Sequence, residues 1–362
     1  MQTPSVDIIV PVWNSPFETR ACLAAVLHSA PEARLIIVDN GSNRETELML
    51  EEFSESLGER GLFITSERNL GLVPAINIGL ARSDGEIALI LQPHVQVSGT
   101  WLAGLAEALQ TTHAGIASPV FSGGGAPLLP PVIADTSLME TFCVSFAALA
   151  LKREMHRQLG GFDENLDGGE WCLKDYVRRA WSRGYHSCVT SRSHVVCGEE
   201  AVFGSEARRQ QQSRLGRVTY RERWGISRHY CIYFGRDTAA TTLSDAMETI
   251  VLGARQGHRF TLLLHRRLAA DFRRLGWHAR HTGIEVQRIS PLMPRRDLLR
   301  RMAALQAACP DIIPVRYVAG IDFPGMTAPI SFGEVADAIR QTRDEESGEP
   351  APLSTTPEVA TA

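Results

Sequence analysis

The first ninety residues alternate between short apolar runs and longer segments with helical spacing. The runs that suit buried strands are Val6–Val12, Arg34–Val38, Leu62–Thr65 and Glu86–Leu91. The segments with helical spacing between them are Phe17–Ser29, Arg44–Leu57 and Pro74–Arg82. Strands and helices that alternate at this pitch predict an α/β fold whose central sheet is mostly parallel, with helices on both faces.

The rest of the chain is less regular. In the middle, the pattern predicts a strand over Phe142–Leu151, short helices over Lys152–Leu159 and Tyr176–Arg183, and a polar helix over Glu206–Trp224 with Ser205 as its N-cap. We therefore expect a first domain over residues 1–235, a small C-terminal α/β domain of unknown role over residues 244–340, and a disordered tail over residues 343–362. The tail is rich in Glu, Ser, Thr and Pro, which is typical of disorder.

Composition narrows the class of protein. The 362 residues are 44% hydrophobic and 22% charged, which is ordinary for a globular protein, and the formal net charge is −4. A net negative chain has no global basic field for nucleic acid, so we expect no nucleic-acid partner. Arginines cluster within residues 208–223 and 295–301. These clusters are either solvated helix faces or surfaces for phosphates and anionic membranes.

The cysteine pattern and the apolar runs bear on location. Seven cysteines are widely spaced without a Cys-x-x-Cys pair, which excludes a disulfide framework and the usual zinc sites. No apolar run approaches the ~20 residues that cross a bilayer. We expect a cytoplasmic protein whose membrane contact, if it has one, is peripheral and at the inner face.

Polar residues follow the predicted strands where ligands bind in parallel sheets, beyond the carboxyl ends. Asn14 follows the first strand, Asp39 closes the second, and Gln92 to His94 follow the fourth. The Asp39 carboxylate can accept hydrogen bonds from a nucleobase or a ribose. The alternative for Asp39 is a turn role, because Asp-Asn-Gly-Ser is strong turn chemistry.

Four segments together resemble glycosyltransferase family 2, which has the GT-A nucleotide-diphospho-sugar transferase fold. They are VDIIVPVWN at Val6–Asn14, LIIVDNGS at Leu35–Ser42, the segment Glu67–Leu80 with Asn69, Gly71, Ala75, Asn77 and Gly79, and Ala150–Glu164 with its GGFDE. The resemblance covers about Val6 to Gly225. It implies a GT-A domain, which the small α/β unit predicted over residues 244–340 would follow as an appendage.

The resemblance also implies an activity. A family 2 enzyme moves a sugar from a nucleoside-diphosphate sugar to a saccharide or lipid-linked acceptor, here with inversion and in bacterial surface glycan or polysaccharide assembly. The residues that match the donor-binding positions are Pro11, Asn14, Asp39, Asn69, Gly71, Gln92 and His94.

The chain departs from the family at the metal motif. The Asp-x-Asp that holds a divalent cation against the diphosphate is replaced by Gln92-Pro93-His94. A Mg²⁺ ion finds poor ligands here, whereas His94 is a candidate ligand for Mn²⁺ or another transition metal, and it can also contact a phosphate directly. One alternative is that His94 and Cys197 together bind a soft metal. The other is that both are ordinary pocket residues without a metal.

The general base is the second departure. Family members carry a Glu-Asp-x-Asp-like motif after GGFDE, whose carboxylate removes a proton from the acceptor hydroxyl. Counting forward from Gly161 places it near Glu170, and counting backward from Gly184 places its last Asp on Asp175. We take Glu170 as the base, while Asp175 is either a second catalytic carboxylate or a brace for its helix.

Two functions from different classes remain. One is a working transferase; the other is a catalytically degenerate module that binds a nucleotide-sugar or serves as a scaffold, which the loss of Asp-x-Asp favours. A dinucleotide-dependent dehydrogenase is excluded, because Trp-Asn-Ser-Pro follows the first strand in place of a G-x-G-x-x-G turn.

Overall fold

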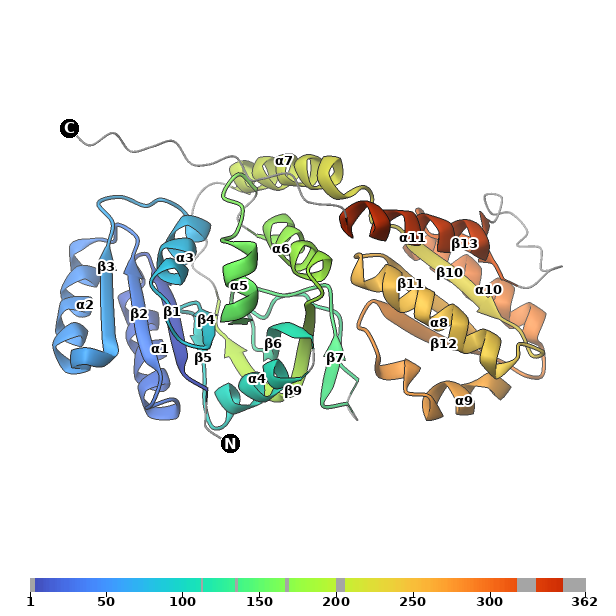
Figure 1. Cartoon of the computed structure of the whole chain (residues 1–362), viewed down its shortest axis with the longest axis horizontal. Helices are drawn as coiled ribbons and strands as arrows, with labels where there is room; N and C mark the ends of the chain where they lie inside the picture. Colours follow the sequence, from blue (N-terminus) through green and yellow to red (C-terminus); the bar gives the residue numbers. More distant parts are fainter. Residues whose placement is uncertain are drawn as a thin grey trace.

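The structure is a computed structural model that describes residues 4–111, 113–133, 136–166, 169–199, 206–317 and 330–347. These residues form a nine-stranded and a five-stranded sheet, each with its own helices, side by side along the long axis (Figure 1). Among the described residues, no helix combines the length and the apolar character that a membrane span requires.

The elements of the first part, up to the end of the long helix α7, are β1 (Val6–Val12), α1 (Pro16–Ser29), β2 (Arg34–Asp39), α2 (Arg44–Leu57), β3 (Gly61–Thr65), α3 (Leu72–Ala81), β4 (Ile87–Leu91), β5 (Val95–Gln96), α4 (Trp101–Gln110), β6 (Ala114–Ser122), β7 (Leu138–Glu140), β8 (Ala148–Lys152), α5 (Arg153–Leu159), α6 (Glu170–Ser182), β9 (His186–Cys197) and α7 (Glu206–Trp224). The elements of the second part are β10 (His229–Phe234), α8 (Ala240–Arg255), β11 (Arg259–His265), α9 (Ala269–Arg274), β12 (Ile284–Ile289), α10 (Pro294–Ala308), β13 (Ile313–Arg316), β14 (Ile330–Ser331) and α11 (Phe332–Ser347).

The first sheet is parallel in one half and mixed in the other. Its order is β3-β2-β1-β4-β8-β6-β9-β5, with β7 added beside β9. Strands β3, β2, β1 and β4 are parallel, and β8 runs antiparallel to both β4 and β6. The predicted α/β fold with crossover helices is therefore confirmed, and the parallel strands that it expected form one half of a mixed sheet.

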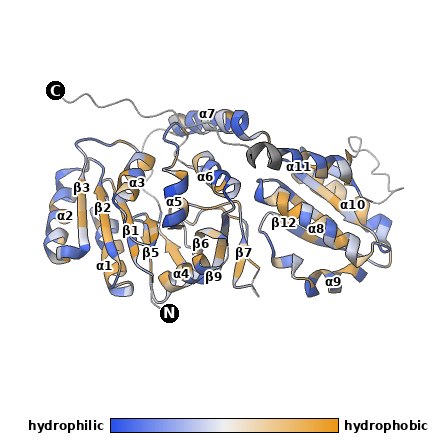
Figure 2. Cartoon of the chain, viewed as in Figure 1, coloured by the Kyte–Doolittle hydropathy of each residue, from blue (hydrophilic) through white to orange (hydrophobic). Residues whose placement is uncertain are grey.

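Alternation along the strands fills a core on each face. In β1, Val10 packs on one side with α1, α2 and α4, whereas Ile9 packs on the other with α3, α5 and α6. Both side chains are fully buried, which contributes about 1.5–3 kcal/mol each. Figure 2 shows the result as apolar strands between helices with more polar outer surfaces. This two-sided cover is why the strands are continuous apolar runs.

The second sheet is entirely parallel, in the order β12-β11-β10-β13-β14. Helices α8 and α11 cover one face, and α10 covers the other. Its central strand β10 begins at His229, so this sheet starts before the predicted division at residues 235–244. Because β10 belongs to the second sheet, the predicted division is too late in the chain. We propose that the boundary lies between Trp224 and His229.

Contacts between the two sheets are specific. The Glu140 backbone in β7 accepts a hydrogen bond from Thr282 N (2.8 Å) and donates one to Arg280 O (3.1 Å). The Glu140 carboxylate binds Arg255 Nε and Nη2 at 2.6 and 2.8 Å. Burial alone would raise the pKa of Glu140, but the bonds and charge of Arg255 outweigh it and lower the pKa. The second unit is thus attached through a largely buried ion pair.

The local predictions differ from the structure at three places. Only the end of the predicted strand Phe142–Leu151 is a strand, β8. Helix α6 begins at Glu170, six residues before the predicted Tyr176. The tail predicted as disordered from Arg343 begins inside α11, and the rest of it lies outside the described residues, as does the predicted N-cap Ser205.

Candidate functional site

The carboxyl ends of β1 to β4 meet at one edge, because these strands are parallel neighbours. Asn40, just after β2, joins the loops that follow β2 and β3. Its Nδ2 donates to Asn69 Oδ1 (3.0 Å) and to Gly71 O (3.1 Å), and its Oδ1 accepts from Leu70 N (2.9 Å). The predicted donor residues Asn69 and Gly71 are therefore held in place by an asparagine that the sequence analysis assigned no role.

Asn14 joins the loops after β1 and β2 in a similar way. Its Oδ1 accepts a hydrogen bond from Asn43 N (2.8 Å), and its backbone N–H donates to Ser42 Oγ (2.9 Å). Asn14 has a left-handed φ of 56°, a conformation that asparagine tolerates better than most residues. Asn43 in turn caps α2 through Thr46 N. Three loops of the edge thus form one bonded surface.

Asp39 is the carboxylate of this edge. It is 5% exposed, and its Oδ1 accepts a hydrogen bond from Ser42 N at 3.0 Å. Its Oδ2 has no hydrogen-bond partner among the described residues. Asp39 therefore does hold the turn, as the alternative reading expected, and it keeps one acceptor oxygen for a ligand.

The remaining predicted donor residues lie on β1 and after β4. Pro11 is buried and pairs with Val38 across the β1–β2 ladder. Gln92 is 7% exposed, and its backbone N–H donates to Ala147 O (3.0 Å). His94 is half-buried, and its carbonyl accepts from Gly198 N (2.9 Å). All the predicted donor residues lie at or just before this one edge.

The residues after β4 do not fit a hard divalent cation. Gln92 offers one amide oxygen and His94 an imidazole, and this stretch has no carboxylate. In the parts of the chain that the structure describes, no group of three or more His, Cys, Asp or Glu residues is arranged to hold a metal. Cys197 lies opposite Val95 in the β5–β9 ladder and is buried. We derive no catalytic step through a metal.

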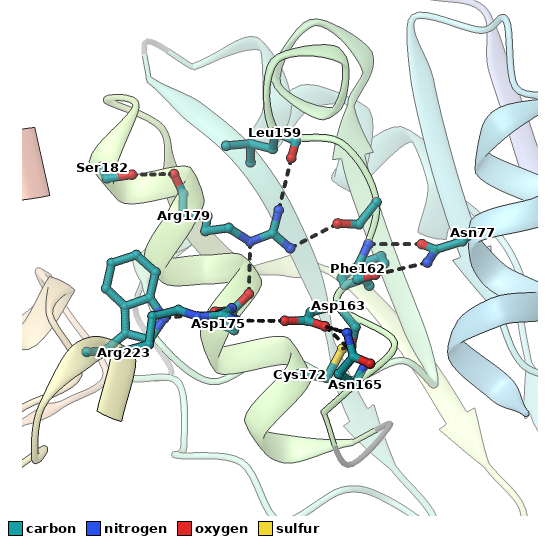
Figure 3. Close-up of polar contacts among 12 residues, drawn as sticks. Asn77, Leu159, Phe162, Asp163, Asn165, Cys172, Asp175, Arg179, Ser182 and Arg223 are labelled. Carbon is teal, nitrogen blue, oxygen red and sulfur yellow. Dashed lines mark hydrogen bonds and ion pairs between the residues drawn. The ribbon is translucent and has the colours of Figure 1, made fainter. Parts of the chain in front are cut away.

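A second group of polar residues links α6, α7 and the loop after α5. Asp175, inside α6 and fully buried, binds Arg179 Nε (2.8 Å), Arg223 Nη1 (2.6 Å) and Trp224 Nε1 (2.8 Å) through its two carboxylate oxygens (Figure 3). Arg223 also binds Asp163 Oδ2 (2.8 Å). Burial by itself would raise the pKa of Asp163, but the Arg223 bonds lower it. Asp175 is thus placed as a brace rather than facing solvent.

Asn77 connects the donor edge with this second group. From α3, its Oδ1 accepts a hydrogen bond from Phe162 N (2.9 Å), and its Nδ2 donates to Phe162 O (2.9 Å) (Figure 3). The same Nδ2 also donates to Glu164 Oε1 (2.8 Å). A Cβ on Gly161 would lie 2.7 Å from Asn77 Oδ1, so any other residue there would force the Asn77 side chain to shift. The GGFDE turn is therefore fixed against the helix that follows the donor loop.

Glu170 differs from Asp175 in its surroundings. It is the first residue of α6, its side chain is 60% exposed, and it pairs with Lys174 Nζ at 2.5 Å. Lys174 also lies 4.5 Å above the Trp171 ring. The two candidate catalytic carboxylates lie on one helix, but only Glu170 is open to a substrate.

The sequence analysis missed the inward contacts of Arg223 and Trp224, because it assigned the arginines of this polar helix either to solvent or to a surface for phosphates and membranes. Both end α7 and turn inward to Asp175. Their side-chain roles depend on packing against α6, which spacing along α7 alone does not reveal. A cavity of about 650 Å³ lies elsewhere: its lining includes Ile87 and Lys152, at the amino end of β4 and the carboxyl end of the antiparallel β8, so it is at the opposite edge of the sheet.

Comparison with known proteins bears on this edge and these loops. Residues 7–134 match the model of glycosyl transferase family 2. The chain carries a family 2 glycosyltransferase domain. The match spans β1 to β6 and includes every predicted donor residue. The family 2 domain has the GT-A fold, as predicted.

Relatives and solved structures agree with the family. The chain is 24% identical over 235 residues to glycosyltransferase AglE of Haloferax volcanii, which covers 59% of this chain and 73% of AglE. It is 22% identical over 249 residues to the inactive polypeptide N-acetylgalactosaminyltransferase-like protein 5 of Mus musculus, covering 59% of this chain and 57% of that protein. The structure of GalNAc-T7 with UDP, GalNAc and Mn²⁺ superposes with a TM-score of 0.52 at 18% identity, over 61% of this chain and 48% of that one.

Proposed function

We propose that this chain transfers a sugar from a nucleoside-diphosphate sugar to a hydroxyl of a saccharide or lipid-linked acceptor, with inversion. The observation that carries the proposal is Asp39: a buried carboxylate with an oxygen left for a ligand, on an edge whose loops are fixed by Asn14 and Asn40. A prearranged edge of this kind loses little conformational freedom when the donor binds.

The nucleoside half of the donor would lie over Asp39, which accepts hydrogen bonds from the base or the ribose. The diphosphate would lie toward Gly71 and His94. Helices α1, α2 and α3 begin just after β1, β2 and β3, so their N-termini point to this edge and favour negative charge. Because the residues after β4 fit a cation poorly, these dipoles and His94 would stabilise the diphosphate as it leaves.

The chemical step would be a single displacement. Glu170 takes the proton of the acceptor hydroxyl, the hydroxyl oxygen bonds to the anomeric carbon, and the bond from that carbon to the diphosphate oxygen breaks. Lys174 orients Glu170 through their ion pair, and the bonds of Asp175 to Arg179 and Arg223 hold α6 in position. Asp175 is on this view a positioning residue.

The acceptor and the place of action are proposed on less direct grounds. The family implies assembly of bacterial surface glycans, in which lipid-linked acceptors stand at the cytoplasmic face of the membrane. A peripheral protein at that face suits a chain whose described helices include no membrane span.

A second candidate function is a non-catalytic nucleotide-sugar module. The absence of a carboxylate at Gln92 to His94 favours it, and one relative is named as inactive. The exposed Glu170 opposes it, because a binding module has no use for a carboxylate at the acceptor side. Donor binding combined with the absence of transfer would select this candidate.

Thermal shift with UDP, GDP and TDP and their common sugars, in EDTA, tests the donor site. We expect at least one nucleotide to stabilise the wild-type chain, and Asp39→Asn to abolish the shift. Asparagine keeps an oxygen for Ser42 N, so the turn survives while the charge is removed. Asp245→Asn, at an exposed position on α8, is the matched control and should respond like wild type. No shift with any nucleotide would contradict the assignment of Asp39.

A further inference from the structure

The carboxyl edge of the second sheet gathers three neighbouring loops. In the register of β10, β11 and β12, Phe234 pairs with Leu264, and His265 pairs with Ile289. The residues that follow these strands therefore leave the sheet at the same level. The nine-stranded sheet supplies the candidate donor site, so nothing in the proposed function uses this second edge.

Arginines dominate these three loops. Those with exposed side chains are Arg236 after β10, Arg266 and Arg267 after β11, and Arg295 and Arg296 at the start of α10. None of the five forms an ion pair with a described residue. Arg236 and Arg267 both lie close enough to His265 to lower its pKa, after burial as the larger cause, so two of the loops converge.

Few carboxylates balance these charges. Asp297 is already bound to Arg300 (2.8 Å) and Arg301 (3.0 Å), and Asp271 is bound to Arg274. Asp237 is the exposed acid beside Arg236. In a chain with a net charge of −4, this edge is therefore a local excess of positive charge with its side chains directed to solvent.

The loop between β12 and α10 adds apolar surface to the same edge. Leu292 is 88% exposed and Met293 is 57% exposed, and Pro291 and Pro294 flank them. The flanking prolines limit the backbone freedom of the pair. Adjacent large apolar side chains at a loop tip, next to Arg295 and Arg296, are costly in water and suit the boundary between lipid headgroups and acyl chains.

We propose that the carboxyl edge of the second sheet docks on an anionic lipid bilayer, with Leu292 and Met293 inserted and the five arginines on headgroup phosphates. The charge complementarity and the exposed apolar pair carry this assignment. It deepens the proposed function, because a docked chain would meet a lipid-linked acceptor at the surface, but vesicle binding itself needs neither donor nor transfer. Figure 1 places α10 at the end of the molecule opposite α2, so docking at this end leaves the donor edge uncovered.

Vesicle flotation without nucleotide tests the surface. We expect the wild-type chain to float with phosphatidylcholine vesicles that contain about a third phosphatidylglycerol, and to remain unbound with pure phosphatidylcholine. Arg295→Glu with Arg296→Glu should weaken partitioning more than tenfold, because each basic residue near an anionic surface contributes about fivefold. Leu292→Ser with Met293→Ser should weaken it at least severalfold, with less change in salt dependence.

Two matched variants supply the controls. Arg214→Glu with Arg217→Glu reverses two exposed arginines of α7, and Leu128→Ser removes another fully exposed leucine from a loop of the first unit. Both should float like wild type, and circular dichroism should show all four variants folded. Absence of wild-type binding to the anionic vesicles overturns the proposal, and so does loss of binding in the α7 variant alone. The nucleotide thermal shift should persist in the edge variants, so a failure here is separable from a failure of the donor site.

Discussion

The two sheets of this chain have parallel strands whose carboxyl ends reach solvent, yet they present opposite surfaces there. At the first sheet, Asn14, Asn40 and Asn69 each bond to backbone groups, and Asn40 also bonds to Asn69, so three loops share one fixed geometry. At the second sheet, arginines such as Arg266 and Arg295 extend outward without ion-pair partners among the described residues. A small ligand needs the first arrangement, since its atoms must be matched one by one. A broad charged surface needs only the second.

The largest expected effect is on catalysis, because all the candidate catalytic residues belong to the first sheet and its helices. Glu170→Gln should lower sugar transfer by a factor of about 10² to 10⁴, because the base is lost while the side-chain shape is kept. Transfer to the acceptor is measured with the nucleotide-sugar found by thermal shift, and donor binding should be unchanged. Glu154→Gln, an exposed glutamate on α5, is the control. Equal activity of the two variants would remove Glu170 from the mechanism.

Buried charge should produce the next largest effect. Asp175→Ala leaves Arg179 and Arg223 without their shared carboxylate and should lower the free energy of unfolding by about 3 kcal/mol. Denaturant unfolding measures the change. Asp175→Asn keeps acceptor capacity for Trp224 and should be milder. If Asp175→Asn instead abolishes transfer with little loss of stability, Asp175 has a chemical role and is more than a brace.

The contact between the sheets should be sensitive to acid. Burial lowers the pKa of His281 to about 4, so the folded chain keeps this side chain neutral while the unfolded chain takes up a proton below about pH 6.5. Stability that is complete at pH 7 should therefore fall between pH 6.5 and pH 4, by about 2 kcal/mol from this group at pH 5. Denaturant unfolding at both pH values, with His281→Asn as the comparison, checks the expectation: the variant should lose less on acidification than wild type does.

The smallest expected effects come from single truncations, one at the carboxyl edge of each sheet, and they compare the two edges directly. Asn40→Ala removes bonds to Asn69, Leu70 and Gly71 and should lower the free energy of unfolding by about 1–2 kcal/mol, with weaker donor binding. Arg266→Ala at the second edge breaks no bond to a described residue and should change it by less than about 0.5 kcal/mol. Similar losses from both truncations would show that the second edge is as tightly bonded as the first.

Sequence reasoning predicted the first sheet well for a physical reason. Strands β1, β2 and β4 are buried on both faces, so their composition alone marks them, and the bounds predicted for β1 and α2 match the structure. The predicted donor residues share one edge because parallel strands must end together. Whether they bind a donor stays a prediction.

The wrong predictions fall where side-chain hydrogen bonds or tertiary contacts override the pattern of apolar and polar residues. In the run Phe142–Leu151, the hydroxyls of Thr141 and Ser145 bond to nearby backbone groups and replace the strand geometry at its start. Strand β10 was missed because its centre-of-sheet position depends on β11 and β13, which lie tens of residues later. The choice between Glu170 and Asp175 could not be made by counting, because only tertiary contacts reveal which carboxylate is enclosed.

The strand order of the first sheet also constrains how the chain folds. The open side of β4 is paired only when β8, about 60 residues later, is available. One side of β6 is likewise paired only when β9, which begins at His186, is available. As the chain leaves the ribosome, β3, β2, β1 and β4 can pair early, with the apolar edge of β4 unprotected until residue 152 has emerged. Loop closure over such separations is slow. The interval in which this edge is bare is the stage at which the chain is most exposed to aggregation and most dependent on chaperones.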